Sequence, residues 1–132
     1  MSELKSTLQD IKGQHFSSKT EVTANVLTVA FTGNLDMDAL ALLKDFYVGL
    51  HRQATALEVA RVDVQLHELY FINSSCLKVL VTWISQVREG VGAEHYPIRF
   101  LTNPNLHWQR RSLNALQCLA RDLITIDAGD AP

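Results

Sequence analysis

The sequence is poor in the features that mark secreted and membrane proteins. Its 132 residues include two cysteines, Cys76 and Cys118, which are too few for a disulfide framework and fit a reducing compartment. The best candidate membrane span, around 77–84, is interrupted by Lys78 and Thr82 and is far shorter than the roughly 20 residues a membrane helix needs. The first residues, MSELKSTLQDIKG, lack the apolar core of a secretory signal. We therefore expect a cytoplasmic protein without a membrane partner.

An excess of positive charge is also lacking. Twelve basic residues stand against fourteen acidic ones, a formal charge of −2, and the basic residues are scattered along the chain. Such a chain shows no electrostatic footprint for nucleic acid or for an anionic membrane. The segment HWQRR, at 107–111, resembles a nucleic-acid contact only superficially, and a helix with its basic residues in solvent explains it better. No nucleic-acid partner is expected.

Motifs for cofactors, metals and nucleotides are missing as well. The five histidines lack metal-ligand spacing, there is no CxxC, and GVGAEH lacks the third glycine of a dinucleotide-binding loop. Asp36 and Asp38 stand near an expected helix start, where capping and the helix dipole explain them better than a metal does. The sequence therefore predicts no catalytic residue, no cofactor, no metal and no small-molecule substrate.

Cys76 is a candidate nucleophile, because a thiol in the first turn of a helix can have a depressed pKa. A cysteine phosphatase loop would need an arginine six residues later, where this chain has Thr82, and the pattern places no histidine nearby. Cys76 also shares an apolar stripe with Leu80 and Trp83, which favours packing in the core. An enzyme that uses this thiol stays open as the weaker alternative.

Periodic patterns are what the chain does have, and they begin with two strands and a helix. A first strand is expected within 15–24. Strict alternation predicts a second strand over 26–33 that ends at Gly33. Apolar residues then recur at helical spacing over about 37–53, and Asp36 is a plausible N-cap. In both patterns the apolar residues lie on one face, so each element is expected to bury that face in the core.

The second half of the chain alternates between strands and helices. A third strand begins near Val62 and becomes apolar on both faces at Leu69–Ile72, which indicates cover on both sides. The helix that follows is expected to end at Gly90 with a left-handed residue. This order implies a largely parallel sheet with right-handed crossovers. The remaining expected elements are strands at 96–102 and 122–127 and a helix after the turn NPN at 103–105.

Four polar or thiol residues, Asn73 to Cys76, join the third strand to the next helix. Amides at a helix start lack intrahelical partners and carry partial positive charge, so they can hold an anion such as a phosphate. A serine hydroxyl there would be exposed and could be modified without disrupting the core. A Ser–Ser pair at such a join is most often only a helix cap, so the pattern by itself leaves cap and site both open.

Three segments, in this order and spacing, resemble the STAS domain: VLTVAFTGNLD, ARVDVQLHELYFINSSCLKVLVTWI and YPIRFLTNP. That domain occurs in bacterial anti-sigma factor antagonists and at the cytoplasmic ends of sulfate transporters. The resemblance covers about 15–127, and FINSSCL looks like the family's Phe-(Ile/Met)-Asp-Ser-Ser-Gly-Leu signature. It implies a STAS-like single α/β domain, with a mixed, mostly parallel sheet of four to five strands and helices packed mainly on one face. Residues 1–14 would then be a flexible or weakly structured extension, and 128–132 a frayed tail.

The resemblance also implies a regulatory function without catalysis. Regulators of this type change partners when a cognate serine kinase, often itself an anti-sigma factor, phosphorylates the first serine of the turn, and a phosphatase reverses the change. Carried over to this chain, that serine is Ser74, with Ser75 as the alternative. The residues expected to bind the protein partner are Asn34, Asp36, Asn73, Ser74, Ser75 and Lys78.

The chain departs from the family pattern at three positions. Asn73 stands where the family has aspartate, Cys76 where it has glycine, and Gln65 where an aspartate is often found near the end of the third strand. Two negative charges are thereby missing around the turn. Two alternatives to the phosphorylation switch stay open: a STAS scaffold that assembles without phosphorylation, and a small-ligand, anion-binding or Cys-nucleophile module.

Overall fold

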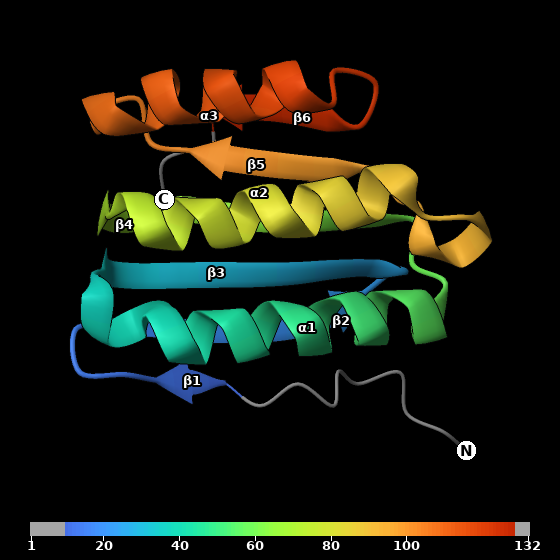
Figure 1. Cartoon of the computed structure of the whole chain (residues 1–132), viewed down its shortest axis with the longest axis horizontal. Coiled ribbons are helices and arrows are strands. Elements are labelled where there is room, and N and C mark those ends of the chain that lie inside the picture. Colours follow the sequence, from blue (N-terminus) through green and yellow to red (C-terminus); the bar gives the residue numbers. More distant parts are fainter. Residues whose placement is uncertain (1–9, 129–132) are drawn as a thin grey trace.

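The computed structural model describes residues 10–128, which form one sheet with helices packed against it (Figure 1). Short 3-10 turns at Met37–Ala39 and Gly92–Glu94 precede the first helix and follow the second helix. Within this part of the chain, no helix combines the length and the apolar character that crossing a bilayer requires. In chain order the elements are β1 (Ile11–Lys12), β2 (Phe16–Thr23), β3 (Val26–Leu35), α1 (Leu40–Leu57), β4 (Arg61–Ile72), α2 (Ser74–Glu89), β5 (Ile98–Thr102), α3 (His107–Leu119) and β6 (Ile124–Ala128).

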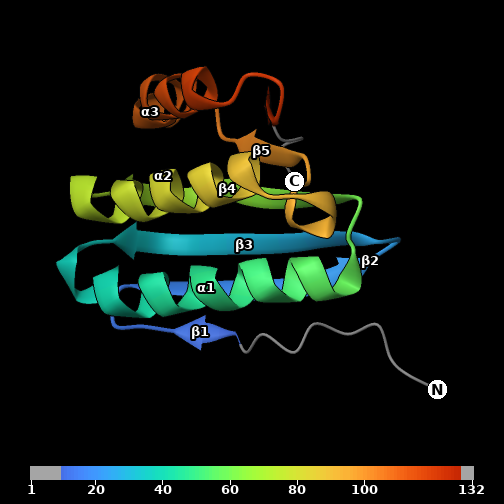
Figure 2. The ribbon, with the colours of Figure 1, turned by 45° about the vertical axis from the view of Figure 1, so that its right-hand side comes forward.

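The order of strands in the sheet follows the order of the sequence. β1, β2 and β3 are antiparallel neighbours, while β3, β4, β5 and β6 run parallel. Each parallel strand is added on the same side of the previous one, and right-handed crossovers then place every connecting helix on the same face. Figures 1 and 2 show α1, α2 and α3 together on one side of the sheet. The predicted α/β domain, with a mixed, mostly parallel sheet and helices on one face, is confirmed.

The hydrophobic core lies between the sheet and the helices. Alternate residues of β3 and β4, among them Leu27, Val29 and Val64, are fully buried, because successive side chains of a strand point to opposite faces. The helices meet this layer with apolar stripes of helical period. The predicted stripe of α2 is buried at Cys76, Leu80, Trp83, Ile84 and Val87.

The sheet has six strands, where the sequence predicts four to five. The additional strand β1 lies within the segment expected to be flexible or weakly structured, yet Ile11–Lys12 pairs with Ser17–Ser18 of β2. Two residues are too few to show an alternating pattern, so this strand is defined only by its partner. Residues 1–9 and 129–132 of the predicted extension and tail lie outside the described residues, and Ala128 belongs to β6.

Gly33 does not end its strand, as the sequence suggests, but lets β3 continue through a bulge. Its backbone φ of +100° is one that residues other than glycine rarely adopt. A Cβ atom at this position would also lie only 2.3 Å from the carbonyl oxygen of His15. Beyond this point the register against β4 shifts, so that Asn34 pairs with Phe71. The bulge therefore carries β3 on to Leu35, beside the start of α2.

Two helix ends also differ from the sequence interpretation. α1 continues to Leu57, where Glu58 closes it in a left-handed conformation with φ of +50°. Gly90, expected to be left-handed, follows α2 with an ordinary φ of −72°. A Cβ atom at Gly90 would lie 2.6 Å from the carbonyl oxygen of Glu94. Glycine is required at this position for a close approach of two backbone segments.

Candidate functional site

The join between β4 and α2 lies at the carboxyl edge of the parallel strands. β3 ends beside it, and the backbone amide of Asn73 donates to the carbonyl oxygen of Leu35 at 2.9 Å. The end of β3 and the start of α2 lie at the same, left-hand side of the molecule in Figure 2. Sites in open parallel sheets gather at this edge, which makes the join the candidate functional site.

Asn73 caps α2 and fixes the geometry of the join. Its side-chain oxygen accepts a hydrogen bond from the backbone amide of Cys76 at 2.8 Å, and its carbonyl oxygen accepts one from Leu77 at 3.0 Å. Its own backbone is extended, so the chain passes from β4 into α2 without a loop. The predicted passage from strand directly into helix is confirmed.

Ser74 and Ser75 occupy the first two positions of α2 but have different surroundings. Ser74 is exposed, whereas Ser75 is half-buried and lines a groove between α1 and α2. Lys78, one turn later, is exposed and lines the same groove. Asn34 is exposed at the end of β3. The structure thus brings the predicted residues to one edge of the sheet, and their role in partner binding stays a prediction.

Cys76 is fully buried in the core. Its Sγ donates to the carbonyl oxygen of Asp36 at 3.4 Å. Burial, and then the negative charge of Asp36, raise the pKa of the thiol above its ordinary value. Both effects disfavour the thiolate that a nucleophilic cysteine needs. The predicted packing of Cys76 in the core is confirmed.

Asp36 stands at the start of the 3-10 turn that leads into α1. One carboxylate oxygen accepts a hydrogen bond from the backbone amide of Asp38 at 3.1 Å, which confirms the predicted cap. The other oxygen lies 2.7 Å from Nδ1 of His15, which comes from the β1–β2 connection. His15, Asp36 and Asp38 thus place one ligand atom each within 4.8 Å of the others. The cap and the contact with His15 account for the position of Asp36.

The arrangement of sheet and helices is found in solved structures of other proteins. The chain matches the crystal structure of an anti-sigma factor antagonist from Mycobacterium paratuberculosis with a TM-score of 0.62 and 16% sequence identity, over 85% of each chain. It matches the NMR structure of the protein TM1081 with a TM-score of 0.53 and 11% identity, over 83% of this chain and 79% of that one. This chain has a STAS-like fold. No protein-family model and no curated protein sequence matches it.

Exposed apolar side chains lie at the carboxyl edge of this STAS-like fold. Tyr70 and Phe71, at the end of β4, are 54% and 49% exposed, and Met37, in the turn before α1, is 61% exposed. The interpretation of 69–72 as a strand covered on both sides is wrong for Tyr70 and Phe71. β5 pairs only with Val62–Gln65, so the end of β4 projects beyond its neighbour. Because neighbouring residues of a strand point to opposite faces, Tyr70 and Phe71 offer a partner one exposed apolar side chain on each face of this edge.

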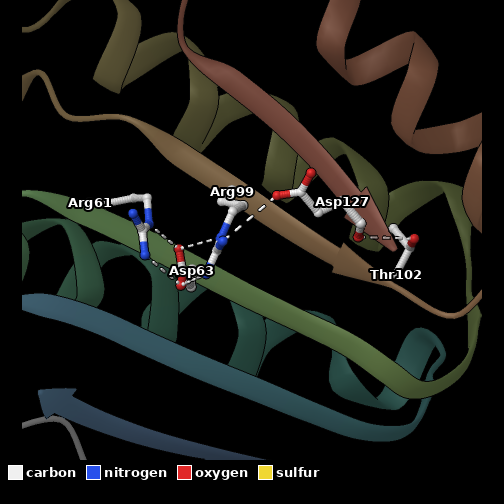
Figure 3. A network of polar contacts seen from close by, with 5 residues as sticks. All are labelled: Arg61, Asp63, Arg99, Thr102 and Asp127. Carbon is white, nitrogen blue, oxygen red and sulfur yellow. Dashed lines mark hydrogen bonds and ion pairs between the residues drawn. The ribbon is translucent and has the colours of Figure 1, made fainter. Parts of the chain in front are cut away.

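The helix-free face of the STAS-like fold carries a charged cluster (Figure 3). Asp63 of β4 is buried and accepts hydrogen bonds from Arg61 at 2.6 Å and from Arg99 at 2.8 Å. Arg99 also lies 3.7 Å from Asp127. Burial by itself would raise the pKa of Asp63, but the hydrogen bonds and charges of the two arginines outweigh burial and lower that pKa. Sequence reasoning missed this cluster, although strand alternation places Arg61 and Asp63 on one face.

Replacing Asp63 with asparagine should lower the free energy of unfolding by about 2 kcal/mol at pH 7, because charge-assisted hydrogen bonds are lost. Since the folded-state pKa of Asp63 is depressed, its contribution is complete above the unfolded-state pKa of about 4 and is lost as pH falls through the lower folded-state pKa. Urea unfolding of both proteins between pH 7 and pH 3 measures this difference. It should stay constant down to about pH 5 and shrink below pH 4.

The matched control is Asp127→Asn, which removes a longer and more exposed contact with the same arginine. Its expected cost is about 0.5 kcal/mol or less. If the difference in free energy of unfolding between the wild type and Asp63→Asn did not change with pH, the ionised carboxylate of Asp63 would not be its source.

Proposed function

We propose that this protein is a non-enzymatic regulator of the anti-sigma factor antagonist type, which acts in the cytoplasm and binds a protein partner at the β4–α2 join. The observation that supports this most is the exposure of Ser74 at the first position of α2, at the edge where Met37, Tyr70 and Phe71 are also exposed. A partner can bury a neutral hydroxyl if it supplies one hydrogen bond, whereas burying a charged phosphate at the same contact costs far more.

Phosphorylation of Ser74 by a serine kinase, which would itself be the anti-sigma factor, is the proposed switch. A phosphoryl group adds about −1.5 to −2 charges at pH 7. The positive end of the α2 dipole and the exposed Lys78, four residues later, offset that charge, so the fold should survive the modification. The contact with the partner would be lost, and a phosphatase would restore it.

The modification itself is tested by the intact mass of the protein isolated from its native cell, followed by peptide mapping. A fraction heavier by about 80 Da, with the added group on Ser74, is the expected result. The same group on Ser75 would move the switch to the second serine. A protein that is never modified under any growth condition would exclude phosphorylation as the regulator.

The effect on binding is tested with the protein that co-purifies with this chain from the same cells. Ser74→Asp should weaken that complex about tenfold or more, because it places a charge in the apolar contact, whereas Ser74→Ala should bind as the wild type does. Isothermal titration calorimetry measures both affinities, and Thr125→Asp, at an exposed position of β6, is a control for added charge elsewhere. Equal affinity of the Ala and Asp variants would contradict the switch.

A scaffold that binds its partner without phosphorylation is the second candidate. Asn73 and Cys76 favour it, since they replace the acid and the glycine of the family signature while the Asn73 cap keeps the turn intact. In that case the mass remains unmodified and the complex still forms through the same edge of the sheet.

A further inference from the structure

α1 and α2 lie side by side and run in the same direction, because each follows one of two adjacent parallel strands (Figure 2). A groove of about 470 Å³ lies between them, here called the α1–α2 groove. Its lining residues include Tyr47 and Trp83, which are buried and whose ring centroids lie 4.7 Å apart. Val48, which is 55% exposed, and the buried Val79 add apolar surface. The groove is therefore an apolar trough that opens to solvent.

The length of the groove suits a helix. On α1 the lining residues Leu40, Lys44 and Val48 recur at every fourth position, which spans about 12 Å at 1.5 Å per residue. On α2 the lining extends from Ser75 to Gln86, or about 16 Å by the same rise. Rows of side chains spaced by four residues form the ridges against which another helix packs. A partner helix of about three turns would fill this space.

Two positive charges border the apolar surface. Lys44 on α1 and Lys78 on α2 are both exposed and both line the groove. Neither lysine forms an ion pair with another residue in the range 10–128. No aspartate or glutamate of that range lines the groove. The surface that complements this groove is therefore apolar and is bordered by carboxylates, which would face the two lysines.

The hydroxyl of Tyr47 lies within the core next to the groove. Tyr47 is 3% exposed, lines the groove, and its hydroxyl has no hydrogen-bond partner among the described residues. Burial raises the pKa of Tyr47, so the hydroxyl remains a donor. Because this oxygen has almost no exposed area, a ligand in the groove does not reach it, and the groove offers a partner its apolar lining and the two lysines.

We propose that the α1–α2 groove binds an amphipathic helix of a partner protein, whose apolar stripe is bordered by acidic residues that pair with Lys44 and Lys78. This contact goes beyond the proposed switch, because Ser74 does not line the groove. Ser75 does line it, so a phosphate on Ser75 would introduce negative charge there and repel the same helix.

The test is an unbiased selection of helical peptides from a display library against the unmodified full chain. Enriched peptides should carry an apolar stripe with flanking Asp or Glu, and should shift the backbone amide NMR signals of α1 and α2.

The double variant Lys44→Glu, Lys78→Glu should weaken their binding about tenfold or more, as measured by fluorescence anisotropy. Peptides in which the acidic residues are replaced by lysine should regain binding to that variant. Lys19→Glu, at an exposed position of β2, is the matched control and should leave peptide binding unchanged.

Three results of the peptide selection would overturn the proposal, and two further observations would assign the groove to another occupant. Enriched peptides could lack acidic residues, bind the double variant equally well, or shift signals only outside α1 and α2. A concentration-dependent dimer that Val48→Asp dissolves would assign the groove to a second copy of the chain. A small apolar molecule retained by the purified protein, seen in native mass spectrometry, would assign it to a small ligand. Because the selection uses unmodified protein, its outcome is independent of whether Ser74 is phosphorylated.

Discussion

Trp83→Ala is expected to lower the free energy of unfolding by about 3 to 5 kcal/mol. Trp83 is 1% exposed, and its ring packs against Tyr47 at 4.7 Å. Its Nε1 donates to the hydroxyl of Tyr96 at 3.0 Å, and Nδ1 of His51 lies 2.7 Å from the same hydroxyl. Truncation would leave a large cavity and remove one of these hydrogen bonds. For a domain stabilised by about 5 to 15 kcal/mol, such a loss approaches complete unfolding.

Urea unfolding followed by far-UV circular dichroism measures the loss, since that signal does not depend on the tryptophan removed. Trp83→Phe keeps an aromatic ring but loses the N–H donor, and should cost about 1 to 2 kcal/mol. The matched control is Trp108→Ala, because Trp108 is only partly buried and its Nε1 has no partner among the described residues. A loss below about 1.5 kcal/mol for Trp83→Ala, with an unchanged urea slope, would contradict tight packing of this ring.

The parts of the fold that could be predicted from the sequence are those in which burial repeats along one element. Leu27 and Val29 alternate with partly exposed residues in β3, and the stripe on α2 recurs at helical spacing, so each pattern states which face is buried. The order of these elements then implies parallel pairing, and right-handed crossovers place the helices on one face. β1 has no such pattern, because two residues cannot show a period.

Some features of the candidate site depend on residues close together in the sequence, and others depend on how distant elements pack. The Asn73 cap is predictable, because the side chain and the amide it accepts from are three residues apart. The exposure of Tyr70 and Phe71 depends on how far β5 extends along β4, and no pattern within β4 states that length. The placement of Lys44 and Lys78 on one groove likewise depends on the packing of two helices. These distant causes shape the surface that a partner would contact.

Gln109 is the clearest case of a residue whose structural role could not be predicted from the sequence. In the segment HWQRR, Arg110 and Arg111 are exposed, as expected, but Gln109 is 1% exposed. Its Nε2 donates to the carbonyl oxygens of Leu66 at 2.6 Å and of Leu69 at 3.1 Å. The pairing of β5 with β4 has ended before these residues, so the strand needs another donor. Gln109 therefore takes the place of a neighbouring strand just before the β4–α2 join.

Gln109→Leu is accordingly expected to lower the free energy of unfolding by about 3 kcal/mol, although leucine has a similar volume. The change leaves two carbonyl oxygens of β4 and the amide of Asn103, which donates to Oε1 at 2.8 Å, without their partner, and each such group costs about 1 to 3 kcal/mol when it stays buried. Urea unfolding measures this loss, and hydrogen exchange should show faster opening of 69–74 than in the wild type.

The matched control for Gln109→Leu is Gln117→Leu, the same change two turns later on α3. Among residues 10–128, Gln117 makes one side-chain hydrogen bond, from Nε2 to the carbonyl oxygen of Ile124 at 3.0 Å. It is only partly buried, so the loss of this bond should cost about 1 kcal/mol. Exchange at 69–74 should then remain as in the wild type, because this bond holds β6 and not β4. If both variants lost the same stability and the join exchanged no faster, Gln109 would be an ordinary packing residue, and the end of β4 would be held by other contacts.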